Sequence, residues 1–376
     1  MMKISLLDLI TQRKSIKESL RTRIEKVLNH GRFIMGPEIL ELERALSRIT
    51  GSKYAYTSSS GTDSLLIALM ALGTKRNDAV FLPSFTWTSC AEVIALIGAK
   101  PVFVDVDKES YNISIDDLEK KILMIRNSAQ YKAKVIMAVD LYGLPANYYA
   151  LNKLSKKYKI RLLADAAQSF GAKIKKVNVG NFAEITTTSF FPSKPLGCYG
   201  DGGALFTNNS LLAKKINSIR LHGTEKNKHD VKRLGINGRM DTLQAAILLA
   251  KLGIFKREIK LRNIIANQYD KFLSKDIITP KRFPKKSSAW AQYTIRVKKR
   301  KKLMEYLQKH NIPSAIYYPK PLHRQTAYKK FTTNLQTLKN SEQLSKEVLS
   351  LPMHPNLKEK HIRFIARTIN KFHEEN

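Results

Sequence analysis

Short apolar runs alternate with amphipathic segments from about residue 55 to residue 207. This alternation is typical of βαβ units, because parallel strands must be joined by crossover segments that are usually helical. The expected strands are residues 79–82, 101–104, 135–139, 161–164, 186–190 and 203–207. Helical spacing occurs between them at residues 116–125 and 148–157. The pattern predicts an α/β fold on a mainly parallel sheet.

The length of the chain predicts two domains. With 376 residues it exceeds the roughly 250–300 residues at which a single hydrophobic core stops growing. A long helical region runs from residue 241 to about 272, and Asp241 with Gln244 resembles a capping box at its start. It is followed by a Pro/Lys-rich stretch (279–288), a strand-like run (291–297) and two helical segments (303–310 and 358–372). We expect a large domain over residues 1–255 and a smaller C-terminal α/β domain over residues 256–376.

Composition argues against export, membrane insertion and a metal site. Residues 1–14 lack a sustained apolar run and a small-residue cleavage site, so they do not resemble a signal peptide. The richest apolar stretches, residues 65–72 and 245–252, are far shorter than the roughly 20 residues that span a bilayer. Cys90 and Cys198 are the only cysteines and lack metal-ligand spacing. We therefore expect a cytoplasmic protein without a metal.

The net charge is unusually positive. Lysine and arginine number 66 against 31 acidic residues, which gives +35 and raises the possibility of nucleic-acid binding. The basic residues form short scattered runs at 173–176, 281–286 and 298–302, and no zinc finger, RNA-binding aromatic strand or basic helix accompanies them. We favour lysine-rich surfaces that attract anionic substrates and expect no nucleic-acid partner.

Asp165 follows the apolar run at residues 161–164. Open α/β sheets bind ligands in the crevice beyond the carboxyl ends of their strands. A carboxylate there can pair with the pyridinium nitrogen of pyridoxal phosphate and keep it protonated, which makes the ring an electron sink. The alternative is an aspartate that caps a neighbouring turn.

Lys194 lies between an apolar strand and a glycine-rich turn. A lysine held there can lose its water, and desolvation lowers the pKa of the amine. The neutral amine is the form that condenses with an aldehyde and later moves protons. A surface lysine is the alternative; the aromatic Phe190 and Phe191, and Asp165 with Gln168 upstream, argue against it. So do the glycines at positions 197, 200, 202 and 203.

A phosphate needs a separate binding site, which Gly61 and Thr62 can supply. They precede the apolar-faced helix at residues 65–72, and free N–H groups at a helix start bind anions. Ser189 adds a second hydroxyl beside Lys194. A plain helix cap is the alternative. Trp87 offers a ring that can stack on a cofactor, or it belongs to the core.

Together these motifs resemble those of the DegT/DnrJ/StrS sugar aminotransferases, a fold-type-I pyridoxal-phosphate family. The likeness covers essentially the whole chain. It is carried by residues 32–43, 60–62, 165–168, 193–197, 235–241, 317–323 and 351–355. Tyr317 departs from the pattern, because many members carry histidine at this position.

The resemblance implies a role for each motif. Lys194 would bind pyridoxal phosphate covalently, Asp165 would pair with its ring nitrogen, and L-glutamate would be the amino donor. Trp87 is placed against the ring face, Gln168 near the 3-hydroxyl, and Gly61, Thr62, Ser189 and Asn237 of the partner subunit around the phosphate. Arg239, Tyr317 and Tyr318 are placed at the substrate. An obligate homodimer with shared active sites follows.

A narrower likeness concerns the substrate. Residues 190–203 and 291–294 resemble the members that aminate C3 of UDP-2-acetamido-2-deoxy-3-oxo-glucuronate on a route to bacterial surface polysaccharide such as O-antigen. Arg239 would then bind the C6 carboxylate, or else only pair with Asp241 or cap its loop. An aminotransferase for a different keto sugar and a pyridoxal-dependent sugar dehydratase remain alternatives. Dehydratases of this fold replace the lysine, often with histidine.

Overall fold

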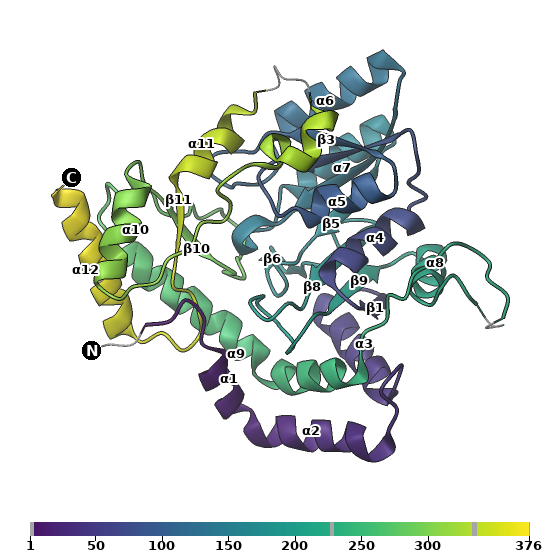
Figure 1. Cartoon of the computed structure of the whole chain (residues 1–376), viewed down its shortest axis with the longest axis horizontal. Helices are drawn as coiled ribbons and strands as arrows, with labels where there is room; N and C mark the ends of the chain where they lie inside the picture. The colour runs from purple at the N-terminus through teal and green to yellow at the C-terminus, as the bar shows by residue number, and fades with distance from the viewer. Residues whose placement is uncertain (1–3, 226–228, 333–336, 376) are drawn as a thin grey trace.

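The computed structural model describes residues 4–225, 229–332 and 337–375, and a seven-stranded sheet forms its centre (Figure 1). The strands are β1 (Tyr54–Ser58), β2 (Asp78–Pro83), β3 (Lys100–Val104), β4 (Lys132–Val139), β5 (Arg161–Asp165), β8 (Ile185–Ser189) and β9 (Gly203–Thr207). They are ordered β1-β9-β8-β5-β4-β2-β3, and only β9 runs antiparallel to its neighbours. The predicted mainly parallel sheet and its six expected strands are confirmed, and β1 was not predicted.

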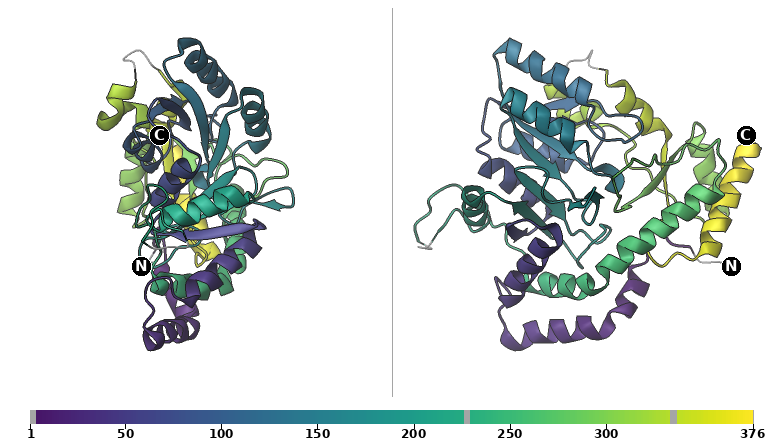
Figure 2. Two further views of the ribbon diagram at one scale, coloured as in Figure 1. Left: turned by 90° about the vertical axis from the view of Figure 1, so that its right-hand side faces the viewer. Right: turned by 180° about the vertical axis from the view of Figure 1, so that it is seen from behind.

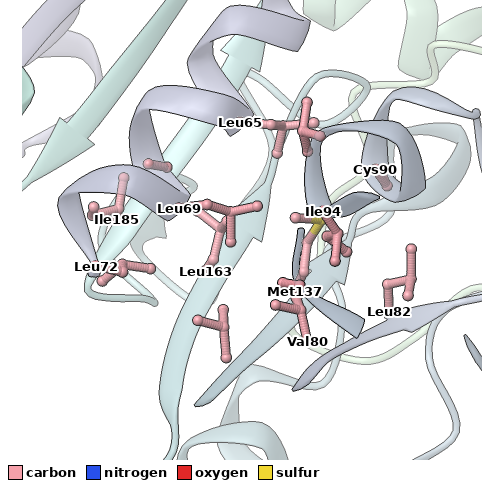
Figure 3. Close-up of a cluster of buried hydrophobic side chains, with 14 of the residues drawn as sticks. Leu65, Leu69, Leu72, Val80, Leu82, Cys90, Ile94, Met137, Leu163 and Ile185 are labelled. Atoms are coloured by element: carbon pink, nitrogen blue, oxygen red, sulfur yellow. The ribbon is translucent and has the colours of Figure 1, made fainter. Parts of the chain in front are cut away.

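Helices cover both faces of this sheet. They are α4 (Gly61–Ala71), α5 (Ser89–Leu96), α6 (Ile115–Ser128), α7 (Tyr148–Tyr158) and α8 (Ser210–Arg220). Val80 and Leu82 of β2 belong to a core with α4, α5 and α8, part of which is drawn in Figure 3. Ala79 and Phe81 belong to a core with α6 and α7. Because successive side chains of a strand point to opposite faces, a strand covered on both sides is apolar throughout.

One long helix, α9 (Thr242–Phe272), connects the sheet to the C-terminal part of the chain (Figures 1 and 2). Near its start, Leu248 packs in a core with α3 (Pro37–Thr50). Near its end, Tyr269 packs in a separate C-terminal core. That core contains β10 (Tyr293–Arg296), β11 (Val348–Leu351), α10 (Arg300–Lys309) and α12 (Glu359–Glu374). Since α9 contributes to both cores, a division at residue 255 stays a prediction.

Shorter elements complete the fold. They are α1 (Leu9–Ser15), α2 (Lys17–His30), the hairpin β6 (Lys173–Ile174) and β7 (Val177–Asn178), α11 (Lys339–Glu347) and the 3-10 helices η1 (Leu141–Gly143), η2 (Leu322–Arg324) and η3 (Thr326–Phe331). Helix α2 lies along α9 on the side away from the C-terminal core (Figure 1). Across the described ranges, no helix has the length and apolar character needed to cross a bilayer.

The predicted capping box at the start of α9 is wrong. Asp241 is the N-cap residue, but its side chain accepts no hydrogen bond from the helix. The Gln244 side chain instead pairs with the backbone of Tyr199: its Oε1 accepts from the amide at 3.0 Å and its Nε2 donates to the carbonyl at 3.3 Å. The amide side chain satisfies both its donor and its acceptor there. The first turn of α9 is thereby attached to the loop that follows Lys194.

Candidate active site

Asp165 is the last residue of β5, at the carboxyl edge of the sheet. Its side chain is buried; Oδ1 accepts from the Ala167 amide at 2.9 Å, and Oδ2 accepts from the Cys90 thiol at 3.3 Å. Burial raises the pKa of the carboxyl, while the Ala167 amide and the charge of Lys194 act in the opposite direction. The aspartate therefore caps its own turn, as the alternative held, and also keeps oxygen lone pairs for a ligand.

Lys194 lies in the loop that follows β8. Its side chain is only partly exposed, and desolvation lowers the pKa of the amine although Asp165 favours the charged form. Within the described chain, Nζ has no hydrogen bond or ion pair, so more than 4.0 Å separates it from the Asp165 oxygens. An amine of lowered pKa thus lies near enough to Asp165 for their charges to interact, without a direct ion pair.

Glycines allow this loop to fold tightly. A Cβ added at Gly197 would lie 2.7 Å from the carbonyl oxygens of Phe191 and Pro192. One added at Gly203, the first residue of β9, would lie 2.5 Å from the Ser60 carbonyl oxygen. Real Cβ atoms do not approach backbone oxygen so closely. The two glycines therefore let the Lys194 loop turn and bring β9 against the start of α4.

The start of α4 has the geometry of an anion site. Ser60 caps the helix, because its side chain accepts from the Asp63 amide at 3.0 Å. The alternative of a helix cap is therefore confirmed for Ser60. Among the described residues, the amides of Gly61 and Thr62 have no acceptor. A Cβ at Gly61 would lie 2.5 Å from the Cβ of Ser189, so only glycine allows this approach. Gly61, Thr62 and Ser189 are thus brought together. The Ser60 cap leaves the Gly61 and Thr62 amides available to bind an anion.

Aromatic and amide side chains gather beside Asp165. Trp87 is 57% exposed, so the alternative that it belongs to the core is wrong. Its ring centroid lies 5.8 Å from that of Tyr318. Gln168 is buried; its Oε1 accepts from the Tyr142 amide at 2.8 Å and its Nε2 approaches the Tyr318 hydroxyl at 3.4 Å. Tyr317 adjoins this group, because its carbonyl accepts from the Tyr142 hydroxyl.

Asn237 and Arg239 lie in the loop before α9. This loop is attached to the phosphate-site segment through the Gly238 carbonyl, which accepts from the Ser59 amide at 3.1 Å. Asn237 is exposed. The Arg239 guanidinium has no hydrogen bond or ion pair within the described residues, and its Nε is buried without a partner. The expected alternative, a pair with Asp241, is therefore not formed.

Two residues that contact Asp165 were not predicted. Cys90 contacts Asp165 from α5, and Asp140 follows β4 as Asp165 ends β5. Asp140 is fully buried, and desolvation raises its pKa to about 6 although Ser169, Ala146 and Tyr148 all donate to it. Its position after an apolar run was a signal that the sequence offered. Contact between Cys90 and Asp165 had no such signal, because 75 residues separate them.

These groups match the parts of pyridoxal phosphate. The free amides of Gly61 and Thr62, with hydroxyls beside them, suit the phosphate. The Lys194 amine suits the aldehyde, the Asp165 carboxylate suits the ring nitrogen, and Trp87 offers an aromatic face. No group of three or more His, Cys, Asp and Glu side chains in the described ranges could hold a metal ion. Fold and site together define a pyridoxal-phosphate enzyme of fold type I.

Comparison with known proteins makes the class specific. The model of the DegT/DnrJ/EryC1/StrS aminotransferase family matches residues 14–370, and the chain belongs to this family. A relative from Pseudomonas aeruginosa, UDP-2-acetamido-2-deoxy-3-oxo-D-glucuronate aminotransferase, is 43% identical over 97% of this chain and 99% of its own length.

Solved structures agree with this assignment. A family aminotransferase from Brucella abortus is 44% identical, with a TM-score of 0.96 over 98% of this chain and 99% of that one. NtdA from Bacillus subtilis, solved with bound PMP, the aminated form of the cofactor, is 28% identical with a TM-score of 0.86 over 95% of this chain and 82% of that one. The protein is a pyridoxal-phosphate-dependent aminotransferase.

Proposed function

We propose that this aminotransferase moves the amino group of L-glutamate to C3 of UDP-2-acetamido-2-deoxy-3-oxo-glucuronate. The observation that carries the proposal is the 43% identity, over nearly both full lengths, to the enzyme of that name. We further propose that the reaction takes place in the cytoplasm and supplies an amino sugar for surface polysaccharide such as O-antigen.

The site residues divide the chemistry between them. Bound pyridoxal phosphate supplies an electron sink for the carbon that loses its proton. The Lys194 amine would hold the cofactor and, when free, would act as the base at the α carbon of glutamate and as the acid at C3 of the sugar. Asp165 keeps the ring nitrogen protonated, and Gly61, Thr62 and Ser189 hold the phosphate. Trp87 covers the ring face, and Gln168 binds near its 3-hydroxyl.

Arg239 is assigned to the C6 carboxylate of the sugar. A guanidinium can bind a carboxylate with two charge-assisted hydrogen bonds, and this one has no partner within the described chain. A partly buried arginine without a counter-charge is costly unless a ligand or a second subunit provides one. Tyr317 and Tyr318, beside Gln168, are assigned to the remainder of the substrate.

Replacing Arg239 with lysine should therefore discriminate between sugars. We expect Arg239→Lys to lower kcat/KM for the 3-oxo-glucuronate, because lysine keeps the charge and loses the planar guanidinium. The loss of transition-state stabilisation should be ~1.5–3 kcal/mol, the range for a hydrogen bond to a charged group. The control is the matching 3-keto sugar with a neutral C6, on which the loss should be small. Equal losses on both sugars would make Arg239 a structural residue.

A panel of keto sugars tests the substrate itself. Purified enzyme is supplied with L-glutamate and with UDP-linked sugars that differ in the position of the keto group and in the charge at C6, and 2-oxoglutarate is measured. The 3-oxo-glucuronate should give the highest kcat/KM. Preference for a neutral or 4-keto sugar would overturn the substrate and leave the aminotransferase assignment intact. The rival dehydratase is disfavoured because position 194 is lysine.

The proposed enzyme is a homodimer in which Asn237 of the partner subunit completes the phosphate site. Asn237 is exposed on a loop next to Phe33 and Ile34, which are 46% and 51% exposed, and the Thr242 amide donates to the Phe33 carbonyl. Leu40 is 51% exposed nearby on α3. An apolar surface beside unpartnered polar groups is typical of a protein interface.

Mixing two inactive variants tests the shared site. If Arg239 acts across the interface, Lys194→Ala and Arg239→Ala subunits should each be inactive alone and should regain up to one working site per mixed dimer. Half of the subunit pairs formed at an equal ratio are mixed, so about one quarter of wild-type activity is expected. Subunit exchange is verified by mass spectrometry of differently tagged chains. No recovery after verified exchange would contradict the shared site.

A further inference from the structure

Cys90 is the one side chain of the described chain that donates a hydrogen bond to Asp165. Its Sγ lies 3.3 Å from Oδ2, while Oδ1 accepts from the backbone amide of Ala167. The two donors approach different oxygens of one carboxylate. The rotation of the Asp165 side chain is therefore fixed from both sides.

The fold holds this thiol rigidly. Cys90 is 1% exposed in the first turn of α5 and packs in the core with Leu82 and Ile94, all three of which are labelled in Figure 3. Burial raises the pKa of the thiol well above its usual value, and the neighbouring Asp165 charge raises it further. The sulfur therefore keeps its proton and acts as a donor. A thiolate at this place would repel the carboxylate.

We propose that Cys90 is a positioning residue for the transamination reaction, whose thiol orients Asp165 toward the cofactor ring and weakens its hold on a proton. A hydrogen bond to a carboxylate favours the ionised form. The proton shared between Asp165 and the ring nitrogen is thereby kept on the nitrogen, where it makes the ring an electron sink. The inference rests on the proposed role of Asp165 and is independent of which sugar is the substrate.

Infrared spectroscopy tests the contact directly, because S–H stretching bands fall where other protein groups do not absorb. The chain has only two cysteines, so Cys198→Ser leaves Cys90 as the sole thiol. In the Cys198→Ser holoenzyme we expect the band of a hydrogen-bonded thiol, shifted toward that of a free thiol when Asp165→Ala is added. An identical band in both proteins would overturn the proposal.

Half-reaction kinetics test the consequence. The reaction with L-glutamate is followed by the absorbance of the bound cofactor. We expect Cys90→Ala to slow it roughly fivefold. This is less than the usual loss for a hydrogen bond to a charged group, because a thiol is a weak donor. Cys90→Ser keeps a donor and should remain within about twofold of the wild-type rate. The effect should fall on the rate at saturating glutamate and not on the glutamate concentration that half-saturates it.

A role in core packing alone predicts a different pattern. Serine and alanine both leave space where the sulfur was, so both should lower the melting temperature, and neither should selectively restore the rate. Equal slowing in Cys90→Ser and Cys90→Ala would therefore overturn the proposal. If the keto-sugar panel fails while the serine variant restores the rate, the proposed substrate is wrong and the role of Cys90 stands.

Discussion

Lys194→Ala is expected to lose the visible absorbance of the lysine-bound cofactor and to lower turnover by at least about 10³-fold, within the range for loss of a positioned acid–base group. The physical reason lies in the loop after β8. Lys194 has a lowered pKa, no ion-pair partner within the described chain and an electrostatic interaction with Asp165. No other amine is placed there by the motif. Absorbance spectra and single-turnover rates with L-glutamate measure the loss.

A second buried lysine provides the matched control. Lys251 of α9 is 2% exposed, its Nζ has no hydrogen-bond partner, and desolvation lowers its pKa to about 8. Its Nζ lies 4.2 Å from the ring centroid of Tyr199. Lys251→Ala should lower the melting temperature and retain the cofactor absorbance. Turnover at the wild-type rate in Lys194→Ala would contradict its assignment as the cofactor lysine.

The sheet was predictable because its strands are covered on both faces. Val80 and Leu82 face one helical layer while Ala79 and Phe81 face the other, so residues 79–82 of β2 form an unbroken apolar run in the sequence. The first strand, β1, reads Tyr-Ala-Tyr-Thr-Ser and carries hydroxyl groups instead. It lies at the sheet edge, next to β9 alone, and its buried Thr57 is satisfied by hydrogen bonds to Glu43. A search for apolar runs therefore missed it.

Contacts between distant residues were not predictable. Gln244 resembled a local cap partner because Asp241 precedes it by three residues. In the structure the Gln244 side chain pairs with the backbone of Tyr199, 45 residues upstream. Local patterns indicate local hydrogen bonds, and a side chain with a better tertiary partner departs from them. The same limit applies to Cys90 and Asp165. The motifs indicated candidate residues such as Asp165 and Lys194, and only the fold showed that Cys90 touches Asp165.

Asp165→Ala is expected to retain part of the cofactor and to slow proton removal from glutamate by ~10²–10⁴-fold, the range for a step that depends on one positioned acid or base. Without the carboxylate the ring nitrogen loses its proton at neutral pH, and a neutral pyridine is a poor electron sink. Retention is expected because Lys194 and the Gly61–Thr62 anion site remain. Stopped-flow absorbance and cofactor content measure the two effects separately.

Asp140 supplies the control that separates this role from general loss of a buried carboxylate. It follows the neighbouring strand β4, donates its backbone amide to the Asp165 carbonyl, and accepts from Ser169, Ala146 and Tyr148. All of those donors belong to the protein, so the Asp140 side chain is assigned no contact with the cofactor. Asp140→Asn should therefore reduce stability and leave the proton-transfer rate within a few-fold of wild type. Near-normal proton removal in Asp165→Ala, or an equal slowing in Asp140→Asn, would contradict the assignment of Asp165 to the ring nitrogen. Asp140 follows β4 and Asp165 ends the adjacent β5. The donors to Asp140 all come from the protein, whereas Asp165 keeps lone pairs for a ligand, and this difference is the basis of the different roles proposed for them.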